Sequence, residues 1–273
     1  MMHYWRLPLS FDAAAMAREA AALRADAWTS HFNADYHDGG WSGIALRAPG
    51  GDASRLYPDP HGQQPYVDTP LRAACPVVDD ALRRFGEGLR SARLLKLAPG
   101  SCIREHRDYG LSLENGEARL HVPISSEAGV EFYLDGELMP MEPGECWYLD
   151  LDRPHRVQNL GRSDRVHLVL DCVADDWLRA QVPDAAEHAR QVALMRQRAA
   201  AVDSAQGRLE RFLRTVLADA ALLDPLAAED EPARFMQQVV QQGRRHGLAF
   251  TTEDVRAAMN ASRREWIERW VVR

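Results

Sequence analysis

His106 and Asp108 stand two positions apart in the stretch Cys102–Gly110, and this spacing is the first sign of chemistry in the chain. Residues i and i+2 of a β-strand project from the same face, so an imidazole nitrogen and a carboxylate oxygen would converge there. A second imidazole is available at His155. Two histidines and one carboxylate form the facial triad of non-heme Fe(II) oxygenases, which leaves coordination positions open for substrate and oxygen.

The tripeptide His-x-Asp occurs often by chance, and alone it is more typical of a surface loop. Arg165 strengthens the interpretation of this tripeptide as part of a metal site, because the arginine begins the strand-like run Arg165–Leu170 shortly after His155. An arginine at that place could hold the far carboxylate of a dicarboxylic co-substrate with its planar fork of donors. His106, Asp108, His155 and Arg165 together therefore predict a metal site with a carboxylate anchor.

The part of the chain that carries these residues has a β pattern. Short alternating runs are separated by turn residues, among them Asp135-Gly136 and Asn115-Gly116, which are both hairpin signals. The spacing indicates about seven short strands, the pattern of a double-sheet jelly roll. In such a fold the inward-facing residues of several strands meet at the mouth of a funnel, so residues that are distant in sequence can share one site.

The N-terminal part is expected to support this sheet. Asp12 or Ser10 can cap an alanine-rich helix that runs through Leu23, and residues 41–47 alternate as a half-buried strand. Residues 48–70 form a long loop rich in proline and glycine, which is either a cover over the site mouth or a disordered insertion. Residues 76–88 are expected to form a helix with proline at its start and glycine at its end.

The β pattern stops after Trp177, and the remaining sequence is helical. We predict a jelly-roll domain over residues 1–180, a helical connector over 181–205 and a small all-α domain over 206–273, so the fold class is α+β. In the last part, Thr251-Thr-Glu-Asp254 is a capping signature that opens a helix.

Composition limits the function classes. The chain has 273 residues, of which 46% are hydrophobic and 27% charged, as expected for a globular protein. The net charge of −7 argues against a nucleic-acid-binding surface. The four cysteines form no Cys-x-x-Cys pair, which favours reduced thiols in a cytoplasmic protein. We find no signal peptide pattern and no stretch long and apolar enough to span a membrane.

The β region resembles the aspartyl/asparaginyl β-hydroxylase family of Fe(II)/2-oxoglutarate dioxygenases, and bacterial free-proline hydroxylases of the same fold are similar over it too. The motifs that carry the resemblance are His-Arg-Asp-Tyr (106–109), Arg-Leu-His-Val-Pro-Ile (119–124), Pro-Gly-Glu-Cys-Trp-Tyr-Leu-Asp (143–150), Pro-His (154–155) and Arg-Val-His-Leu-Val-Leu-Asp (165–171).

The resemblance implies a cupin-like double-stranded β-helix and residue roles within it. His106, Asp108 and His155 match the iron ligands, and Arg165 matches the anchor for the distal carboxylate of 2-oxoglutarate. Arg119 and His121 match positions that help to hold the co-substrate near the iron. The implied cofactors are Fe(II), 2-oxoglutarate and O2. Asp108 is a departure from the animal aspartyl hydroxylase, which has glycine there, and it brings the chain closer to the proline hydroxylases.

Residues 208–259 resemble a second unit, the small helical Nif-eleven-type domain known as a leader region of ribosomally made peptides. The pattern Arg-Phe-Leu (211–213), Asp219, Leu222, Phe235, Gly247 and Phe250–Val255 carries this resemblance. A generic helical extension is the alternative. If the resemblance holds, the C-terminal helices are a candidate surface for a peptide or protein partner.

The leading hypothesis is a hydroxylase that acts on an amino acid, either an Asp/Asn-type residue in a peptide or protein or a free amino acid, while 2-oxoglutarate is decarboxylated to succinate. A cupin-like enzyme with the same metal site is a second hypothesis, although Arg165 speaks against it. A non-catalytic jelly roll that senses a small acid or serves as a peptide-binding scaffold is a third. The intact triad disfavours this last hypothesis.

Overall fold

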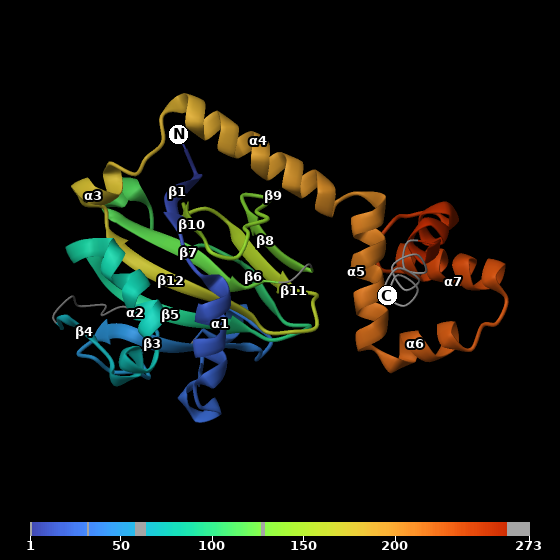
Figure 1. Cartoon of the computed structure of the whole chain (residues 1–273), viewed down its shortest axis with the longest axis horizontal. Helices are drawn as coiled ribbons and strands as arrows, with labels where there is room; N and C mark the ends of the chain where they lie inside the picture. Colours follow the sequence, from blue (N-terminus) through green and yellow to red (C-terminus); the bar gives the residue numbers. More distant parts are fainter. Residues whose placement is uncertain (1, 32, 58–63, 127–128, 261–273) are drawn as a thin grey trace, which may run out of the picture. The chain divides into compact units, whose positions relative to one another are not determined.

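The computed structural model describes residues 2–31, 33–57, 64–126 and 129–260, shown in colour in Figure 1. The chain divides into two compact units. The first comprises Met1–Asn159 and Ser163–Met195, and the second comprises Leu160–Arg162 and Arg196–Arg273. We describe each unit by itself, and the domain limits at residues 180 and 205 stay predictions.

The first unit is built on a large antiparallel sheet. Its strands follow the order β1-β10-β7-β12-β5-β3-β2, and β4 pairs with the C-terminal end of β3. Their bounds are Tyr4–Ser10 (β1), Thr29–Ser30 (β2), Trp41–Pro49 (β3), Tyr66–Asp68 (β4), Leu89–Leu97 (β5), Glu117–Ser125 (β7), Glu145–Leu149 (β10) and Arg165–Val173 (β12).

A smaller antiparallel sheet faces the large one. Its order is β6-β11-β8-β9, with the bounds Cys102–His106 (β6), Val130–Leu134 (β8), Glu137–Leu138 (β9) and His155–Asn159 (β11). One apolar core joins the two sheets, with Leu95 and Trp147 from the large sheet and Ile103 and Phe132 from the small one. Two facing sheets of this topology form a double-stranded β-helix, which confirms the predicted fold class.

Helices cover the other face of the large sheet. They are α1 (Ala13–Ala22), α2 (Pro76–Leu82) and the short α3 (Asp176–Arg179). A second apolar core lies between them and the sheet and includes Met16, Val78, Leu168 and Leu178. Asp12 caps α1 by accepting a hydrogen bond from the Ala15 backbone N–H, as the sequence predicted.

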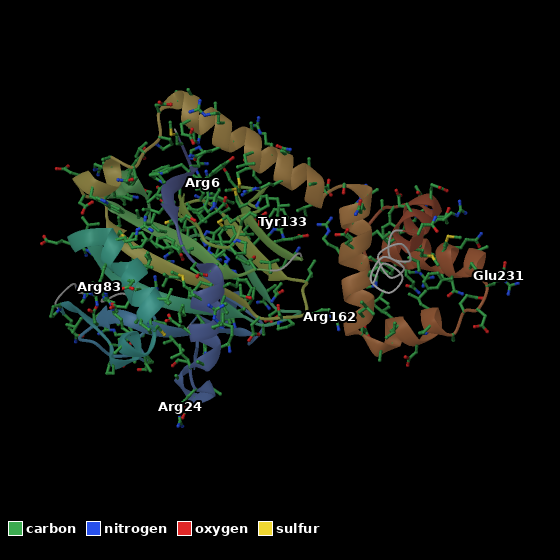
Figure 2. The ribbon with its side chains drawn as sticks, viewed as in Figure 1. Arg6, Arg24, Arg83, Tyr133, Arg162 and Glu231 are labelled. Atoms are coloured by element: carbon green, nitrogen blue, oxygen red, sulfur yellow. The ribbon has the colours of Figure 1, made fainter. Side chains whose placement is uncertain are left out.

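The first part of α4 (Ala185–Val202) protects the edge strand β1. The side-chain amide of Gln191 accepts from the Arg6 N–H at 2.8 Å and donates to the Arg6 carbonyl at 3.1 Å. His188 contacts the Tyr4 carbonyl through Nε2 at 3.1 Å. The Arg6 side chain, labelled in Figure 2, pairs instead with Glu145 of β10. These bonds occupy backbone groups that an open edge would offer to another strand.

The second unit is helical. It contains the end of α4, then α5 (Ala205–Ala218), α6 (Ala220–Ala227), α7 (Pro232–Arg245) and helical residues 252–260, around a core that includes Leu209, Phe212, Val239 and Phe250. Thr251 and Asp254 form the predicted cap, because each side chain accepts a hydrogen bond from the other residue's backbone N–H. The Nif-eleven resemblance of this unit stays a prediction.

Several details differ from the expectation. Asn115-Gly116 forms no hairpin: Gly116 ends the 3-10 turn Leu113–Asn115 with φ 84°, and β7 then pairs with β10 and β12. Asp135-Gly136 does join β8 and β9, with φ values of 52° and 80° that suit a type I′ turn. The expected helix 76–88 ends at Leu82 and continues as the 3-10 turn Arg83–Gly88.

In the β-rich part from residue 89 onward, the described residues form eight strands, β5–β12, where the sequence indicated about seven. Two short edge strands of the N-terminal part, β2 and β4, were not expected, because they are too short to show a periodic pattern. Three further 3-10 turns lie at Ala25–Ala27, Ala34–Tyr36 and Pro70–Ala74. Among the described helices, none is both long and apolar enough to cross a membrane.

Candidate active site

His106 and His155 lie opposite each other on the paired strands β6 and β11. Their ring centroids are 4.2 Å apart. In each ring Nδ1 contacts the carbonyl two residues earlier, at 2.8 Å from the Arg104 oxygen and 3.0 Å from the Arg153 oxygen. Because a carbonyl only accepts, each Nδ1 must carry the proton, and the neutral ring then presents the lone pair of Nε2.

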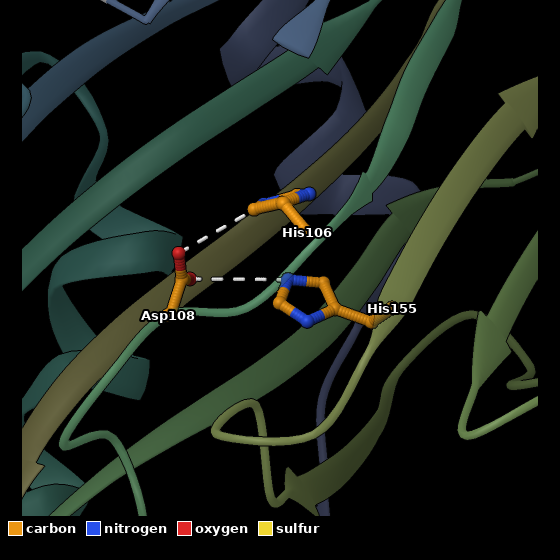
Figure 3. Close-up of side chains that lie close together, drawn as sticks. All are labelled: His106, Asp108 and His155. Carbon is orange, nitrogen blue, oxygen red and sulfur yellow. Dashed lines mark ion pairs between the residues drawn. The ribbon is translucent and has the colours of Figure 1, made fainter.

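Asp108 completes the cluster from just beyond the end of β6. Its Oδ1 lies 3.8 Å from His106 Nε2 and its Oδ2 lies 3.9 Å from His155 Nε2, as drawn in Figure 3. One ligand atom from each of the three residues falls within 4.8 Å of the others. Two imidazole nitrogens and one carboxylate oxygen are a donor set that suits Fe(II). The three residues that the sequence singled out therefore converge.

The reason given for this convergence was partly wrong. Asp108 does not share the strand with His106, since β6 ends at His106. Its backbone N–H instead donates to the Leu151 carbonyl at 2.9 Å, in the loop that leads to His155. The carboxylate is therefore held by a contact between two loops, which a two-residue spacing could not reveal.

Two central strands of the large sheet carry polar residues on their inner face. Arg119 and His121 project from β7, and Arg165, His167 and Asp171 project from β12. Their neighbours in sequence, such as Leu120 and Leu168, pack on the other face against the helices. The alternation of the strands thus places one layer of charged and polar groups inside the fold.

Arg165 is buried, with 2% of its surface exposed, and no carboxylate lies within salt-bridge distance of it among the described residues. Its Nη2 donates to His167 Nδ1 at 2.9 Å, and its Nε has no hydrogen-bond partner in that same set. Burial lowers the pKa of this guanidinium to about 9. A buried cation without a counter-ion is costly, so the position is suited to an anionic ligand.

Arg119 bridges two carboxylates. Its Nη1 donates to Asp108 Oδ2, and its Nε and Nη2 donate to Asp171 at 2.6 and 3.1 Å. Asp171 also accepts from Arg93 and from the Ser91 hydroxyl. Although burial alone would raise the pKa of Asp171, the charges of Arg119 and Arg93 hold it below the usual range. Sequence reasoning missed Asp171 and Arg93.

His121 and His167 are buried, neutral side chains on the same inner face of the sheet. Burial, followed by the charge of Arg165, lowers the pKa of both rings well below the usual value. Their Nδ1 atoms are 3.4 Å apart. His167 is a hydrogen-bonded core histidine whose partner is Arg165 of the site.

Most of these groups line one pocket that is partly open to solvent. His106, Asp108, His155, Arg119, His121 and Arg165 all line it. The apolar part of its wall consists of Trp41, Leu95, Ile103, Phe132, Leu151, Val157 and Val169. All six site residues predicted from the sequence therefore meet in one place.

The loop before β3 supports this wall. His31 stacks on Trp41 with ring centroids 3.4 Å apart, and His37 meets the same indole edge-on. Tyr36 stacks on His106 at 4.6 Å. Although His31 and His37 lie in a loop, both are buried against the site. His61 lies outside the described residues.

Part of the chain is similar to known proteins. A family model described as aspartyl/asparaginyl beta-hydroxylase matches residues 11–175. The chain belongs to this family. The match covers α1, α2 and the strands β2 to β12, leaves Arg196–Arg273 outside, and confirms the family resemblance seen in the sequence.

Two curated proteins are similar to part of this chain. One is an L-proline cis-4-hydroxylase from Rhizobium meliloti, 26% identical over 165 residues that cover 60% of the chain and 58% of that protein. The other is an L-proline cis-3-hydroxylase from a Streptomyces species, 29% identical over 147 residues that cover 52% of the chain and 50% of that protein. The chain thus spans only about half of each relative.

Solved structures show more distant likeness. A 2OG-Fe(II) oxygenase family oxidoreductase from Burkholderia pseudomallei has a TM-score of 0.40 and 17% identity, and the match covers 64% of this chain and 85% of that one. A viral collagen prolyl hydroxylase from Paramecium Bursaria Chlorella virus-1 has a TM-score of 0.38 and 9% identity over 63% of this chain and 97% of that one.

Proposed function

We propose that this protein is an Fe(II)/2-oxoglutarate-dependent dioxygenase that hydroxylates an amino acid. The observation that carries the proposal is the pairing of two features in one cavity: the convergent triad His106, Asp108 and His155, and the buried, uncompensated guanidinium of Arg165. A metal site alone would fit many jelly rolls. The unpaired cation beside it is what calls for a carboxylate co-substrate.

The triad would hold Fe(II) through His106 Nε2, His155 Nε2 and one oxygen of Asp108. When bound, the iron and the keto acid would supply oxidative decarboxylation to succinate and carbon dioxide, in which one oxygen atom of O2 would enter succinate and the other would be inserted into a substrate C–H bond. The protein contributes the positions of these groups and the exclusion of water. The hydrogen bonds from each Nδ1 to a backbone carbonyl fix both imidazole rings in the orientation that a metal needs.

Arg165 would bind the distal carboxylate of 2-oxoglutarate. Its Nη2 donates to His167, while Nε has no partner among the described residues and is left for the ligand. His121 lines the same pocket and would contact the co-substrate. Arg119 would act on the co-substrate through Asp108, whose carboxylate accepts a hydrogen bond from it. The apolar wall around Trp41 and Phe132 would receive the substrate's aliphatic part.

L-Proline is the first substrate to test. Both curated relatives carry L-proline in their names, and the chain has the carboxylate Asp108 that a complete triad requires. The test is aerobic incubation of purified protein with Fe(II), 2-oxoglutarate and single amino acids, followed by mass spectrometry for a product 16 Da heavier. Succinate must form in equal amount. The Asp108→Ala protein is the control, and product from that variant would refute the assignment.

An Asp- or Asn-containing peptide is the second substrate class to include, because the family model is named for such residues. If succinate forms only with peptides, the function stands but the substrate is not a free amino acid. If no amino acid or peptide increases succinate formation above the rate without substrate, the hydroxylase proposal is wrong.

A further inference from the structure

The carboxylate of Asp171 lies away from the proposed metal position but is tied to it through a single side chain. Asp171 sits on the inner face of β12, directly opposite Arg119 on β7 and Ser91 on β5. It is 8% exposed and receives hydrogen bonds from Arg119, Arg93 and Ser91. Both strands that flank β12 therefore direct donors at this one carboxylate.

Two hydrogen bonds join the Arg119 guanidinium to the Asp171 carboxylate. Nε reaches Oδ1 at 2.6 Å and Nη2 reaches Oδ2 at 3.1 Å, so one edge of the planar guanidinium is occupied. A guanidinium held along one edge cannot rotate freely, and its remaining nitrogen is then presented in a fixed direction. That nitrogen, Nη1, donates to Oδ2 of Asp108.

This arrangement distinguishes the two oxygens of Asp108. Oδ2 is engaged by Arg119, whereas Oδ1 accepts no hydrogen bond within the described part of the chain and lies 3.8 Å from His106 Nε2. The carboxylate is thereby set to offer one oxygen to a metal. The net charge of this cluster is zero, because the carboxylates of Asp108 and Asp171 alternate with the cations Arg119 and Arg93.

We infer that Asp171 is a positioning residue for the metal site, which orients Arg119 so that Arg119 fixes Asp108 as a one-oxygen ligand. The inference rests on the proposed function only for the identity of the metal site. Asp171 touches neither metal nor substrate in this scheme and acts entirely through Arg119. The triad motif does not reveal Asp171, because this residue is distant from Asp108 in sequence and is linked to it through Arg119, its partner across the paired strands β12 and β7.

The test is a titration of the full chain with Co(II) under anaerobic conditions, read by the visible d–d absorption of the bound ion. Asp171→Asn removes the charge and keeps the size of the side chain. We expect its Co(II) dissociation constant to rise at least about tenfold, the lower end of the range for partners that orient metal ligands. Asp164→Asn is the matched control, since Asp164 lies just before β12 and its side chain pairs with Lys96, outside the site, and it should bind Co(II) as the wild type does.

A double-mutant cycle separates positioning from general damage. If Asp171 acts through Arg119, then Asp171→Asn should have little further effect on Co(II) binding in an Arg119→Gln background. If the two effects simply multiply, the inference is wrong. An unchanged Co(II) affinity in Asp171→Asn, in a protein whose wild type binds Co(II) and turns over 2-oxoglutarate, overturns the inference and leaves the proposed function intact.

Arg119→Lys keeps the test decisive if Asp171→Asn does not fold. Lysine keeps the charge, but its single ammonium group cannot span both carboxylates. We expect Arg119→Lys to weaken Co(II) binding at least about tenfold. Wild-type affinity in this variant would show that only charge is needed at residue 119, which contradicts the bridge. A wild type that binds no divalent metal would refute both this inference and the proposed function.

Discussion

Replacement of Arg165 by methionine should change stability and ligand binding in opposite directions. The guanidinium is buried and has no carboxylate partner among the described residues, so the folded protein carries the cost of desolvating a charge. Methionine has a similar length and no charge. We therefore expect Arg165→Met to unfold at a higher denaturant concentration than the wild type when no 2-oxoglutarate is present, and to bind 2-oxoglutarate far more weakly.

The magnitudes follow from what the side chain contacts. Exchange of buried charged groups for apolar ones of similar volume can stabilise a protein by about 1–4 kcal/mol. Against this stands the hydrogen bond from Nη2 to His167 at 2.9 Å, whose loss costs about 1–1.5 kcal/mol. These ranges give a net change between a loss of about 0.5 and a gain of about 3 kcal/mol, and their midpoints give a gain of about 1 kcal/mol. Removal of one partner of a buried charge pair costs about 2–5 kcal/mol, which corresponds to a rise in the 2-oxoglutarate dissociation constant of roughly 30-fold or more.

The assay combines urea unfolding with calorimetric titration of 2-oxoglutarate into protein that is saturated with Mn(II). Arg90→Met is the matched control, because Arg90 lies on β5 with 46% of its side chain exposed and pairs weakly with Glu117. It should leave both quantities unchanged. Arg165→Met that binds 2-oxoglutarate as tightly as the wild type would refute the assignment of the anchor. A marked loss of stability would refute the claim that its charge is uncompensated.

Three further outcomes are expected. Asp108→Asn should leave the free energy of unfolding within about 1 kcal/mol of the wild type and abolish substrate-dependent succinate formation, measured by mass spectrometry; turnover by the variant would remove Asp108 from the triad. Burial and the neighbouring His106 lower the pKa of His155 to about 4, so between pH 6.5 and pH 4 the unfolded chain binds more protons than the folded protein. The metal-free protein should therefore lose stability as pH falls through this window. A free energy of unfolding, measured with urea, that stays constant between these pH values would contradict this. Gly136→Ala should cost about 1 kcal/mol by thermal or urea unfolding, because φ is 80° in the β8–β9 turn, without changing Co(II) affinity.

The metal-site residues could be predicted because their chemistry is specific. Only a few residue types bind iron, and His106, Asp108 and His155 occur in a β-rich segment with a suitably placed Arg165. The jelly roll could be predicted as a class because alternating strands and turns such as Asp135-Gly136 are local signals.

Pairing between distant strands could not be predicted from one sequence. The alternation of Arg165, His167 and Asp171 on β12 shows that these residues share a face, but not that Arg119 and Ser91 lie on the neighbouring strands. A fully buried strand with three polar residues on one face was nevertheless a usable signal, because buried charges need partners. His31 and Tyr36 were missed because a loop has no period from which burial can be deduced.

The central claim is that the triad and Arg165 together bind Fe(II) and 2-oxoglutarate in one cavity. The most direct measurement is an anaerobic titration of the protein with Fe(II) and 2-oxoglutarate, monitored for the weak visible charge-transfer band of a keto acid chelated to iron. We expect the band in the wild type and its loss in His106→Ala and Asp108→Ala. A wild type that binds Fe(II) but shows no band at saturating 2-oxoglutarate would contradict the claim.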